Sequence, residues 1–557
     1  MKQLLLLETV LTGLVFVSLL LFVNCKSITA RLESALSRVE KKPLLAVLGI
    51  IVIAIALRAA CLGFFPAPQP RIHDEFSYLL AADTFVHGRV SNPTHPFWQF
   101  FESFHINQVP TYVSMYPPAQ GLVLAAGRLM GGNAWTGVLI STAIMCAALC
   151  WMLQGWLPGR WAFIGGLIAV VRIALFSYWG NSYWGGSVAA IGGLLVLGAL
   201  PRMLKRDASV IYFLVFGLGI LILANSRPYE GLLLCVAMAL AALTMFLRSK
   251  QRPANLLTVK WLAVVLTLFA GFAAMGFYNW RVTGHPTLMP YKVHEQQYAM
   301  AHAFLWQRPT PDVEYRHEVM KKFWREYYDA AVRARSVRGF FALTAEKLSK
   351  TFLFFIGPIL ALPLIAFPRA IRDRRIRFLM LTALFAVPGL LVETWFHSHY
   401  AAPFIGIVYV LLLQCLRHVR FSRALTPRRR YAAFLTVPAV IVLMTVIAVI
   451  TFPPKVQGRD FGIWCCNPDG PTDRTWLISR LQTQGERHLV FVEYTPEHNA
   501  NEEDEWVYNA ADIDGSPVVF ARSMDAARNT QLAQYFSDRQ VWRLVVGHRP
   551  LKLERYK

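Results

Sequence analysis

Residues 44–75 read LLAVLGIIVIAIALRAACLGFFPAPQPRIHDE, and this stretch points to a membrane protein. Its first 22 residues carry a single charge, Arg58, and are long enough to cross the hydrocarbon core of a bilayer. A Pro-rich exit and two adjacent acids, Asp74 and Glu75, follow. Because lipid offers no partner for unpaired backbone groups, the apolar run must be an α-helix.

The composition extends this interpretation to most of the chain. The 557 residues are 55% hydrophobic and 16% charged, whereas a soluble protein carries about a quarter charged residues. A disordered chain, a disulfide-rich secreted module and a soluble enzyme are therefore excluded. We expect about twelve spans, near residues 4–23, 44–65, 134–154, 161–178, 184–200, 209–224, 230–247, 258–277, 351–367, 378–395, 401–416 and 432–452. Glu8 interrupts the first apolar run and no small-residue cleavage site follows it, so we interpret this run as a retained helix rather than a signal peptide.

The formal net charge of +23 belongs to the membrane part. Residues 453–557 contain 13 Lys and Arg against 15 Asp and Glu, while the first 452 residues contain 43 against 18. Five basic clusters fall on one side of the expected topology, at residues 31–42, 202–206, 248–260, 369–377 and 417–430. The positive-inside rule makes that side cytoplasmic, so the charge reports topology and we expect no nucleic-acid partner.

The sequence predicts a mainly α, polytopic helical membrane bundle in three parts. Residues 1–43 form an N-terminal span and cytoplasmic linker, and residues 44–452 form a transmembrane domain with outer loops at 66–133 and 278–350. Segments 117–131 and 313–350 should be helices lying at the outer membrane surface. Residues 453–557 should form a small extracytoplasmic α/β domain, with strands at 488–494, 517–521 and 541–546 and a helix near 525–539. We expect that domain to cap the protein or to contact an acceptor rather than to catalyse.

The acidic pair is the first candidate for chemistry. Asp74 and Glu75 follow soon after the exit of a span, where one carboxylate can act as a general base and its neighbour can orient it. The alternative is that the pair only caps the next helix, since acids are favourable at a helix N-terminus.

Further motifs follow one another along the same topology. Residues 115–137 read MYPPAQGLVLAAGRLMGGNAWTG, residues 278–286 read YNWRVTGHP, and residues 399–403 read HYAAP. With the acidic pair, their order and approximate spacing resemble the C-type (GT-C fold), polyprenyl-phosphate-dependent membrane glycosyltransferases, the family 39-like class of protein O-mannosyltransferases and lipid A aminoarabinose transferases. The turn at 178–184, YWGNSYW, lacks the acid that relatives often carry there, so no role is transferred for it.

The resemblance implies an inverting hexosyl- or pentosyltransferase. Its donor would be a sugar on a polyprenyl phosphate, its acceptor an envelope lipid, polysaccharide or protein, and its catalytic residues Asp74 and Glu75. The leaving phosphate needs cationic partners, and the outward-facing candidates are Arg227, Arg281, Lys292 and His399. The expected substrate-contacting residues are Tyr116, Trp179, Tyr183, Tyr229 and Tyr400.

Several of these residues have structural alternatives. Arg227 can pair with Glu230 instead of a phosphate, and His399 can be a hydrogen-bonded boundary histidine. Trp179 and Tyr183 also fit the aromatic belt of a membrane interface. No cofactor is required by the implied chemistry. A divalent metal stays an open question, because His73 and His399 can join the acidic pair but no spacing demands it, and the eight cysteines, including the adjacent Cys465 and Cys466, show no metal-binding pattern.

The main alternative function is a transporter or lipid flippase of the cell envelope. Such proteins often show repeated halves with broken helices at mid-bilayer, and we find no such repeat. A second alternative is an assembly protein whose tail binds an envelope partner, which would leave the acidic pair without a task. The sequence therefore favours a multi-pass glycosyltransferase of the inner membrane, with its active site and C-terminal domain on the periplasmic side.

Overall fold

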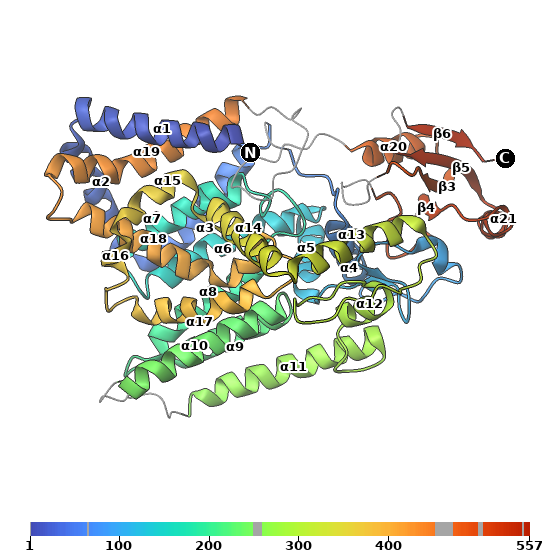
Figure 1. Ribbon diagram of the computed structural model, residues 1–557, viewed down its shortest axis with the longest axis horizontal. Coiled ribbons are helices and arrows are strands. Elements are labelled where there is room, and N and C mark those ends of the chain that lie inside the picture. Colours follow the sequence, from blue (N-terminus) through green and yellow to red (C-terminus); the bar gives the residue numbers. More distant parts are fainter. Residues whose placement is uncertain are drawn as a thin grey trace.

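The computed structural model describes residues 2–63, 66–248, 259–451, 472–498, 505–547 and 551–556. Figure 1 shows a large helical bundle that occupies most of the molecule and a smaller unit of strands and helices, coloured red, at one end. The expected mainly α, polytopic bundle with a small C-terminal α/β domain is confirmed. The expected domain boundary at residue 453, and Cys465 and Cys466, lie outside the described residues.

The bundle is built from helices of very different lengths. They are α1 (Lys2–Phe22), α2 (Cys25–Glu40), α3 (Pro43–Ala60), α6 (Trp135–Leu153), α7 (Gly159–Ala169), α8 (Ser187–Met203), α9 (Val210–Ala224), α10 (Pro228–Arg248), α11 (Trp261–Thr283), α15 (Gly357–Ala361), α16 (Phe367–Ala370), α17 (Arg377–Leu391), α18 (Ile405–Arg420) and α19 (Pro427–Thr451). A π-helical turn, Val170–Leu175, continues α7, and 3₁₀ turns cover Trp98–Phe101, Leu362–Ala366 and Ser398–Phe404.

The chain is a multi-pass membrane protein, but the expected count of about twelve spans is not confirmed. By length and composition, 7 helices among the described residues can cross a membrane, or up to 8 if a bent pair counts as one span. That pair is Val337–Phe355 with Gly357–Ala370, bent by 91°. Helices α8, α9 and α17 are apolar but shorter than a full crossing, because a straight span needs about 20 residues.

Four further helices come from the two segments that the sequence predicts to be outer loops. They are α4 (His73–Val86), α5 (Pro118–Gly131), α12 (Pro290–Tyr298) and α13 (Glu318–Ala334), and α14 (Val337–Phe355) follows directly. The expected surface helix at 117–131 is present as α5, which ends at Gly132 in the left-handed conformation with φ 74°. The expected helix at 313–350 is two helices, because Ser336 caps the start of α14 by accepting a hydrogen bond from the Gly339 amide at 3.0 Å.

The C-terminal unit contains α20 (Asp473–Gln482), β3 (Arg487–Tyr494), β4 (Val518–Arg522), α21 (Ala526–Tyr535), β5 (Arg539–Val546) and β6 (Lys552–Arg555). The strand order is β4-β3-β5-β6, with β3 parallel to both neighbours and β6 antiparallel at the edge. The three expected strands and the helix between them are therefore confirmed, while α20 and β6 were not expected. A small hairpin of β1 (Ile106–Asn107) and β2 (Val113–Ser114) lies in the first outer loop.

The C-terminal unit packs directly on α4. The ring of Phe76 is stacked on that of Tyr508, with centroids 4.0 Å apart, and the Ala511 amide donates to the Asp83 carboxylate at 2.7 Å. Farther along the same contact, the Arg522 guanidinium donates to the backbone oxygen of Glu102 at 2.6 Å. The helix that carries the acidic pair is thus held between the bundle and the α/β unit.

The first helix is joined to the bundle by a buried ion pair. Arg172, in the π-helical turn after α7, lies 3.2 Å from the Glu8 carboxylate, and both side chains are at most 2% exposed. The amide of Ile359 also donates to Glu8, at 3.1 Å. Because an unpaired charge at this depth is costly, Glu8 fixes α1 against α7 and α15.

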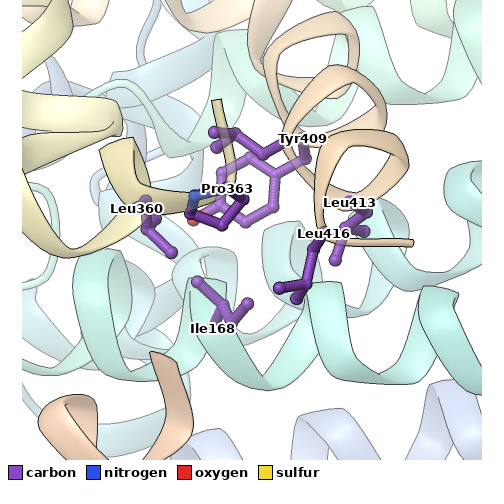
Figure 2. A pocket seen from close by; sticks show the side chains of 7 residues that line it. Ile168, Leu360, Pro363, Tyr409, Leu413 and Leu416 are labelled. Carbon is purple, nitrogen blue, oxygen red and sulfur yellow. The ribbon is translucent and has the colours of Figure 1, made fainter. Parts of the chain in front are cut away.

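Close packing continues beside this ion pair. Figure 2 shows a small apolar cavity between α7, α15, the 3₁₀ turn after it and α18, lined by Ile168, Leu360, Pro363, Tyr409, Leu412, Leu413 and Leu416. Its volume is about 10 Å³, which is at the lower limit for a single water molecule. This cavity is a packing defect and is too small to hold a substrate.

Candidate active site

A cavity of about 360 Å³ lies where the outer helices meet the ends of the spans. This volume falls in the range of small-molecule sites. Its walls come from the start of α4, the segment before α5, helices α13 and α14, and the segment between α17 and α18. The lining residues are Asp74, His105, Met115, Tyr116, Trp184, Trp324, Tyr327, Ala330, Ala334, Leu343, Glu346, Lys347, Lys350, Thr394, Trp395, Phe396, His397 and Tyr400.

Asp74 is the carboxylate that α4 contributes to this cavity. It lies in the first turn of α4 and its side chain is 19% exposed. The phenol of Tyr116 donates a short hydrogen bond to Asp74 Oδ1, and His105 Nδ1 lies 2.7 Å from the same phenol oxygen. Since the phenol proton is directed at Asp74, the His105 ring donates through Nδ1. The three side chains form one hydrogen-bonded chain that ends at the carboxylate.

The backbone around His105 is held in an uncommon conformation. His105 has φ 60°, the only positive φ of a non-glycine residue in the described part of the chain. Its carbonyl accepts hydrogen bonds from the Ser77 hydroxyl at 2.6 Å and from the Met115 amide at 3.1 Å. Burial lowers the pKa of His105 to about 3, so the ring is neutral near pH 7. A strained, neutral histidine beside the carboxylate is typical of a functional site.

Glu75 occupies a different environment from Asp74. Its carboxylate is fully buried and accepts hydrogen bonds from the backbone amides of Arg71 at 2.9 Å, Ile72 at 3.2 Å and Tyr183 at 3.0 Å. It therefore caps the N-terminus of α4 and joins it to the turn before α8. The expected acidic pair is divided between one carboxylate in the cavity and one that organises the backbone.

Cationic side chains lie on the other walls. Lys347 and Lys350 come from α14, and Lys350 Nζ lies 2.6 Å from Glu346. Lys347 is buried, and its ammonium donates to the backbone oxygens of Leu391, at 2.8 Å, and Glu393. The cavity therefore combines two carboxylates, Asp74 from α4 and Glu346 from α14, with two ammonium groups from α14.

Arg227 lies beside the cavity. Its guanidinium is 4.1 Å above the ring of Tyr400, which lines the cavity, and 3.3 Å from the Glu230 carboxylate. The expected alternative for Arg227, an ion pair with Glu230, is thus present. The residue also lines a small neighbouring recess with Tyr78, Gln120 and Trp184. Arg227 therefore contacts the cavity wall through Tyr400 and does not itself line the cavity.

Two further polar groups of this region have strongly altered acidity. Burial and the neighbouring Glu230 carboxylate raise the pKa of Glu393 well above its ordinary value. Burial lowers the pKa of His397 to about 4, and the neighbouring Lys350 acts in the same direction. A protonated carboxyl group and a neutral imidazole are what such shifts produce near pH 7.

Of the other residues expected from the sequence, three are structural supports. His399 is 1% exposed, and its Nδ1 is 2.9 Å from the Tyr178 hydroxyl. Trp179 is fully buried against Phe354, with centroids 5.3 Å apart. The hydroxyl of Tyr183 donates to the Pro68 carbonyl at 2.9 Å.

Three more lie away from the cavity. Tyr229 donates its hydroxyl to the Gly389 carbonyl at 2.9 Å, and Lys292 forms a close ion pair with Glu295. Arg281 is exposed. Tyr116 and Tyr400 line the cavity beside Asp74, so the structure brings together only part of the expected set.

The sequence analysis missed several cavity residues. His105 sits in an irregular loop with no motif around it, and Tyr327, Lys347 and Lys350 belong to the segment that we interpreted only as a surface helix. A signal was present in the second case. Lys347 and Lys350 are three residues apart and therefore share a helix face, which is the face that meets the cavity.

The arrangement of the side chains bears on whether the site could bind a metal ion. Among the described ranges, no group of three or more His, Cys, Asp or Glu side chains is arranged to hold a metal ion. The four residues that the sequence offered for such a site do not converge. Glu75 faces backbone amides and His399 faces Tyr178, while His73 stacks at 4.8 Å on Phe104.

No protein-family model and no curated protein matches the chain. Several solved structures do match the chain. ArnT from Cupriavidus metallidurans in the apo state aligns at 13% identity and a TM-score of 0.49, over 90% of this chain and 92% of that one. The same protein bound to undecaprenyl phosphate aligns at 12% identity and a TM-score of 0.47, with the same coverage.

An archaeal protein is also similar. The Archaeoglobus fulgidus oligosaccharyltransferase tethered to an acceptor peptide containing the NVT sequon aligns at 10% identity and a TM-score of 0.48, over 89% of this chain and 68% of that one. We base the function below on the motifs and on the residues of the cavity.

Proposed function

We propose that this chain is an inverting glycosyltransferase that moves a sugar from a polyprenyl phosphate to an envelope acceptor. One observation carries the proposal: a partly exposed carboxylate, Asp74, shares a cavity of about 360 Å³ with two lysines, Lys347 and Lys350. Transfer from a sugar phosphate requires a base for the acceptor and cations for the leaving phosphate, and this cavity contains both.

In the proposed reaction, Asp74 accepts the proton of an acceptor hydroxyl or amine. The acceptor oxygen or nitrogen then forms a bond to the anomeric carbon while the bond from that carbon to the phosphate oxygen breaks. The polyprenyl phosphate leaves with the bonding electron pair, and attack from the opposite side inverts the configuration. Tyr116 and His105 hold the carboxylate in place, and Glu75 holds the helix that carries it.

The leaving phosphate gains negative charge during this step. Lys350 and Lys347 reach the cavity from α14, and Arg227 is held beside it by the ring of Tyr400 and by Glu230. Arginine is suited to phosphate because its planar fork binds two oxygens. We assign the phosphate to these three cations. This proposal gives no role to Arg281, Lys292 or His399, which the sequence also offered for the phosphate.

The aromatic rings of the cavity suit the sugar and the lipid. Trp184, Trp324, Tyr327, Trp395 and Tyr400 give its walls large apolar faces, and such faces pack against the C–H groups of a sugar ring. The sequence places five basic clusters on the opposite side of the membrane. They support an outward, periplasmic orientation of this site in an inner membrane.

The test uses the purified full-length protein with a panel of labelled polyprenyl-phosphate hexoses and pentoses, and envelope lipids, polysaccharides and peptides as acceptors. Asp74→Asn should reduce transfer 10²- to 10⁴-fold, while Asp329→Asn, the same change at an exposed ion pair with Arg325 on α13, should leave it unchanged. Equal transfer by both variants would refute the assignment of Asp74. Absence of transfer with every donor, together with solute or lipid movement in liposomes, would favour the transporter.

A further inference from the structure

A second cavity, of about 330 Å³, opens between the first outer loop and the segment around α12 and α13. It lies outside the proposed active site, and the two cavities have no lining residue in common. We call it the outer cleft. Its lining residues are Trp98, Glu102, Val109, Gln297, Tyr298, Glu314, Tyr315, Arg316 and Met320.

The side chains of the outer cleft combine aromatic faces with planar polar groups. Trp98 and Tyr315 contribute rings, and Gln297, Glu314 and Arg316 contribute hydrogen-bonding groups. The Arg316 guanidinium lies 4.7 Å from the centre of the Trp98 ring. A sugar has an apolar face of C–H groups and an edge of hydroxyls, so an aromatic ring next to amide, carboxylate and guanidinium groups matches both of its surfaces.

The floor of the outer cleft is rigid. The Glu102 carboxylate is 2% exposed and accepts hydrogen bonds from the Tyr298 hydroxyl at 2.9 Å and from Arg316 at 3.1 Å. The backbone oxygen of Glu102 accepts a hydrogen bond from the Arg522 guanidinium of the C-terminal unit. Arg316 neutralises Glu102, and Glu314 leaves one formal negative charge in the lining, which disfavours a phosphate or an acidic peptide relative to a neutral ligand.

One helix connects the outer cleft with the proposed active site. Met320 of α13 lines the cleft, while Trp324 and Tyr327 of the same helix line the active-site cavity. Residues at positions i, i+4 and i+7 share one helix face, and four residues advance a helix by about 6 Å. The two cavities therefore follow each other along the same face of α13, as two subsites for one extended ligand would.

We infer that the outer cleft binds saccharide units of the acceptor that lie beyond the unit receiving the new sugar. The acceptor is then a neutral glycan or glycolipid whose chain runs along α13 from the cleft to Asp74. The role of the cleft as an acceptor subsite rests on the proposed glycosyltransferase function. Saccharide binding in the cleft does not depend on that function, and it is measured separately.

The binding test uses the purified full-length protein and three neutral hexasaccharides: an α-linked glucan, a β-linked glucan and a β-linked N-acetylglucosamine oligomer. Saturation-transfer difference NMR reports contact with each. Trp98→Ala and Arg316→Gln should each weaken binding of at least one oligomer about tenfold, the loss expected when a stacking or charged hydrogen-bonding contact worth about 1.4 kcal/mol is removed. Trp476→Ala and Arg480→Gln are matched controls, because that pair forms a similar exposed contact, 5.3 Å from guanidinium to ring, on α20.

The outcomes separate the inference from the proposed function. Loss of binding in the cleft variants alone supports the subsite, even where no sugar transfer is found. Equal signals in wild type and cleft variants for all three oligomers, or no signal with any of them, would overturn it, even if Asp74-dependent transfer is established. With an active donor, Trp98→Ala should raise the KM of a long glycan acceptor and leave that of a monosaccharide acceptor unchanged.

Discussion

The phenol of Tyr116 donates its hydrogen bond to Oδ1 of Asp74, and this contact joins the two ends of the first outer loop. Asp74 opens α4, whereas Tyr116 precedes α5, 42 residues later. Because Tyr116 occupies Oδ1, the second carboxylate oxygen is the one that can accept a proton from an acceptor. The geometry of the proposed base is therefore set by a residue that lies far from it in the sequence.

Tyr116→Phe should reduce kcat and leave the acceptor KM nearly unchanged. The ring still packs on Tyr78, at 4.5 Å between centroids, but the hydrogen bond that orients the carboxylate is lost. We expect a decrease of about tenfold in kcat, against 10²- to 10⁴-fold for Asp74→Asn, since only the second change removes the base itself. Steady-state kinetics with a fixed donor measure both. Tyr328→Phe on α13 is the control, and a Tyr116→Phe enzyme with full kcat would show that Asp74 needs no positioning.

Lys350→Gln should raise the KM of the lipid-linked donor by about tenfold at low salt. The ammonium lines the cavity and is 38% exposed, so a phosphate can approach it. A charge-assisted hydrogen bond to phosphate is about twice as strong as a neutral one, and the effect should shrink as salt screens the charge. Donor titrations at two salt concentrations test this, with the exposed Lys321→Gln as control. A donor KM equal to that of Lys321→Gln would exclude Lys350 from the phosphate site.

The sequence was sufficient for the architecture and for part of the site. Apolar run length predicted the helices of the bundle, and strand-like and helical segments predicted the α/β unit. The expected number of spans is not confirmed, because α8, α9 and α17 are apolar yet short, and α14 with α15 is bent at Gly357. Composition measures hydrophobicity along the chain and carries no information on such bends.

The site was only partly predictable for a related reason. Asp74 and Glu75 are adjacent in the sequence, but successive helical residues point in different directions, about 100° apart. One carboxylate consequently faces the cavity and the other faces the Tyr183 amide. His105 reaches Asp74 through a loop conformation that no periodic pattern describes. Contacts of this kind depend on tertiary structure, and the single sequence cannot specify them.

The buried ion pair between Glu8 and Arg172 should be essential for stability. Glu8→Ala leaves the guanidinium of Arg172 buried at 2% exposure with its carboxylate partner removed. Loss of one partner of a buried pair costs about 3–5 kcal/mol, so the apparent Tm in detergent should fall markedly. The double variant Glu8→Leu with Arg172→Leu should recover much of this loss, because no uncompensated charge remains.

The control for that pair is Asp329→Ala. Asp329 pairs with Arg325 at 3.5 Å on α13, and the two side chains are 47% and 56% exposed, so water can solvate the arginine that is left behind. Its loss should change the apparent Tm much less, in line with the small contribution of exposed pairs. Equal Tm values for Glu8→Ala and Asp329→Ala would show that α1 is not held by the ion pair.

The folded protein should lose stability as the pH falls below about 6.5, the ordinary pKa of histidine. Burial is the main cause that lowers the pKa of His73 to about 4, and it lowers that of His105 to about 3. Between these values and 6.5 the unfolded chain binds protons that the folded protein does not, so each group reduces stability by up to about 1.4 kcal/mol per pH unit. Apparent Tm measured from pH 7.5 to 5 tests this. His73→Gln should flatten the decline relative to wild type, whereas the exposed His285→Gln should leave its slope unchanged, and parallel slopes for all three proteins would contradict the prediction.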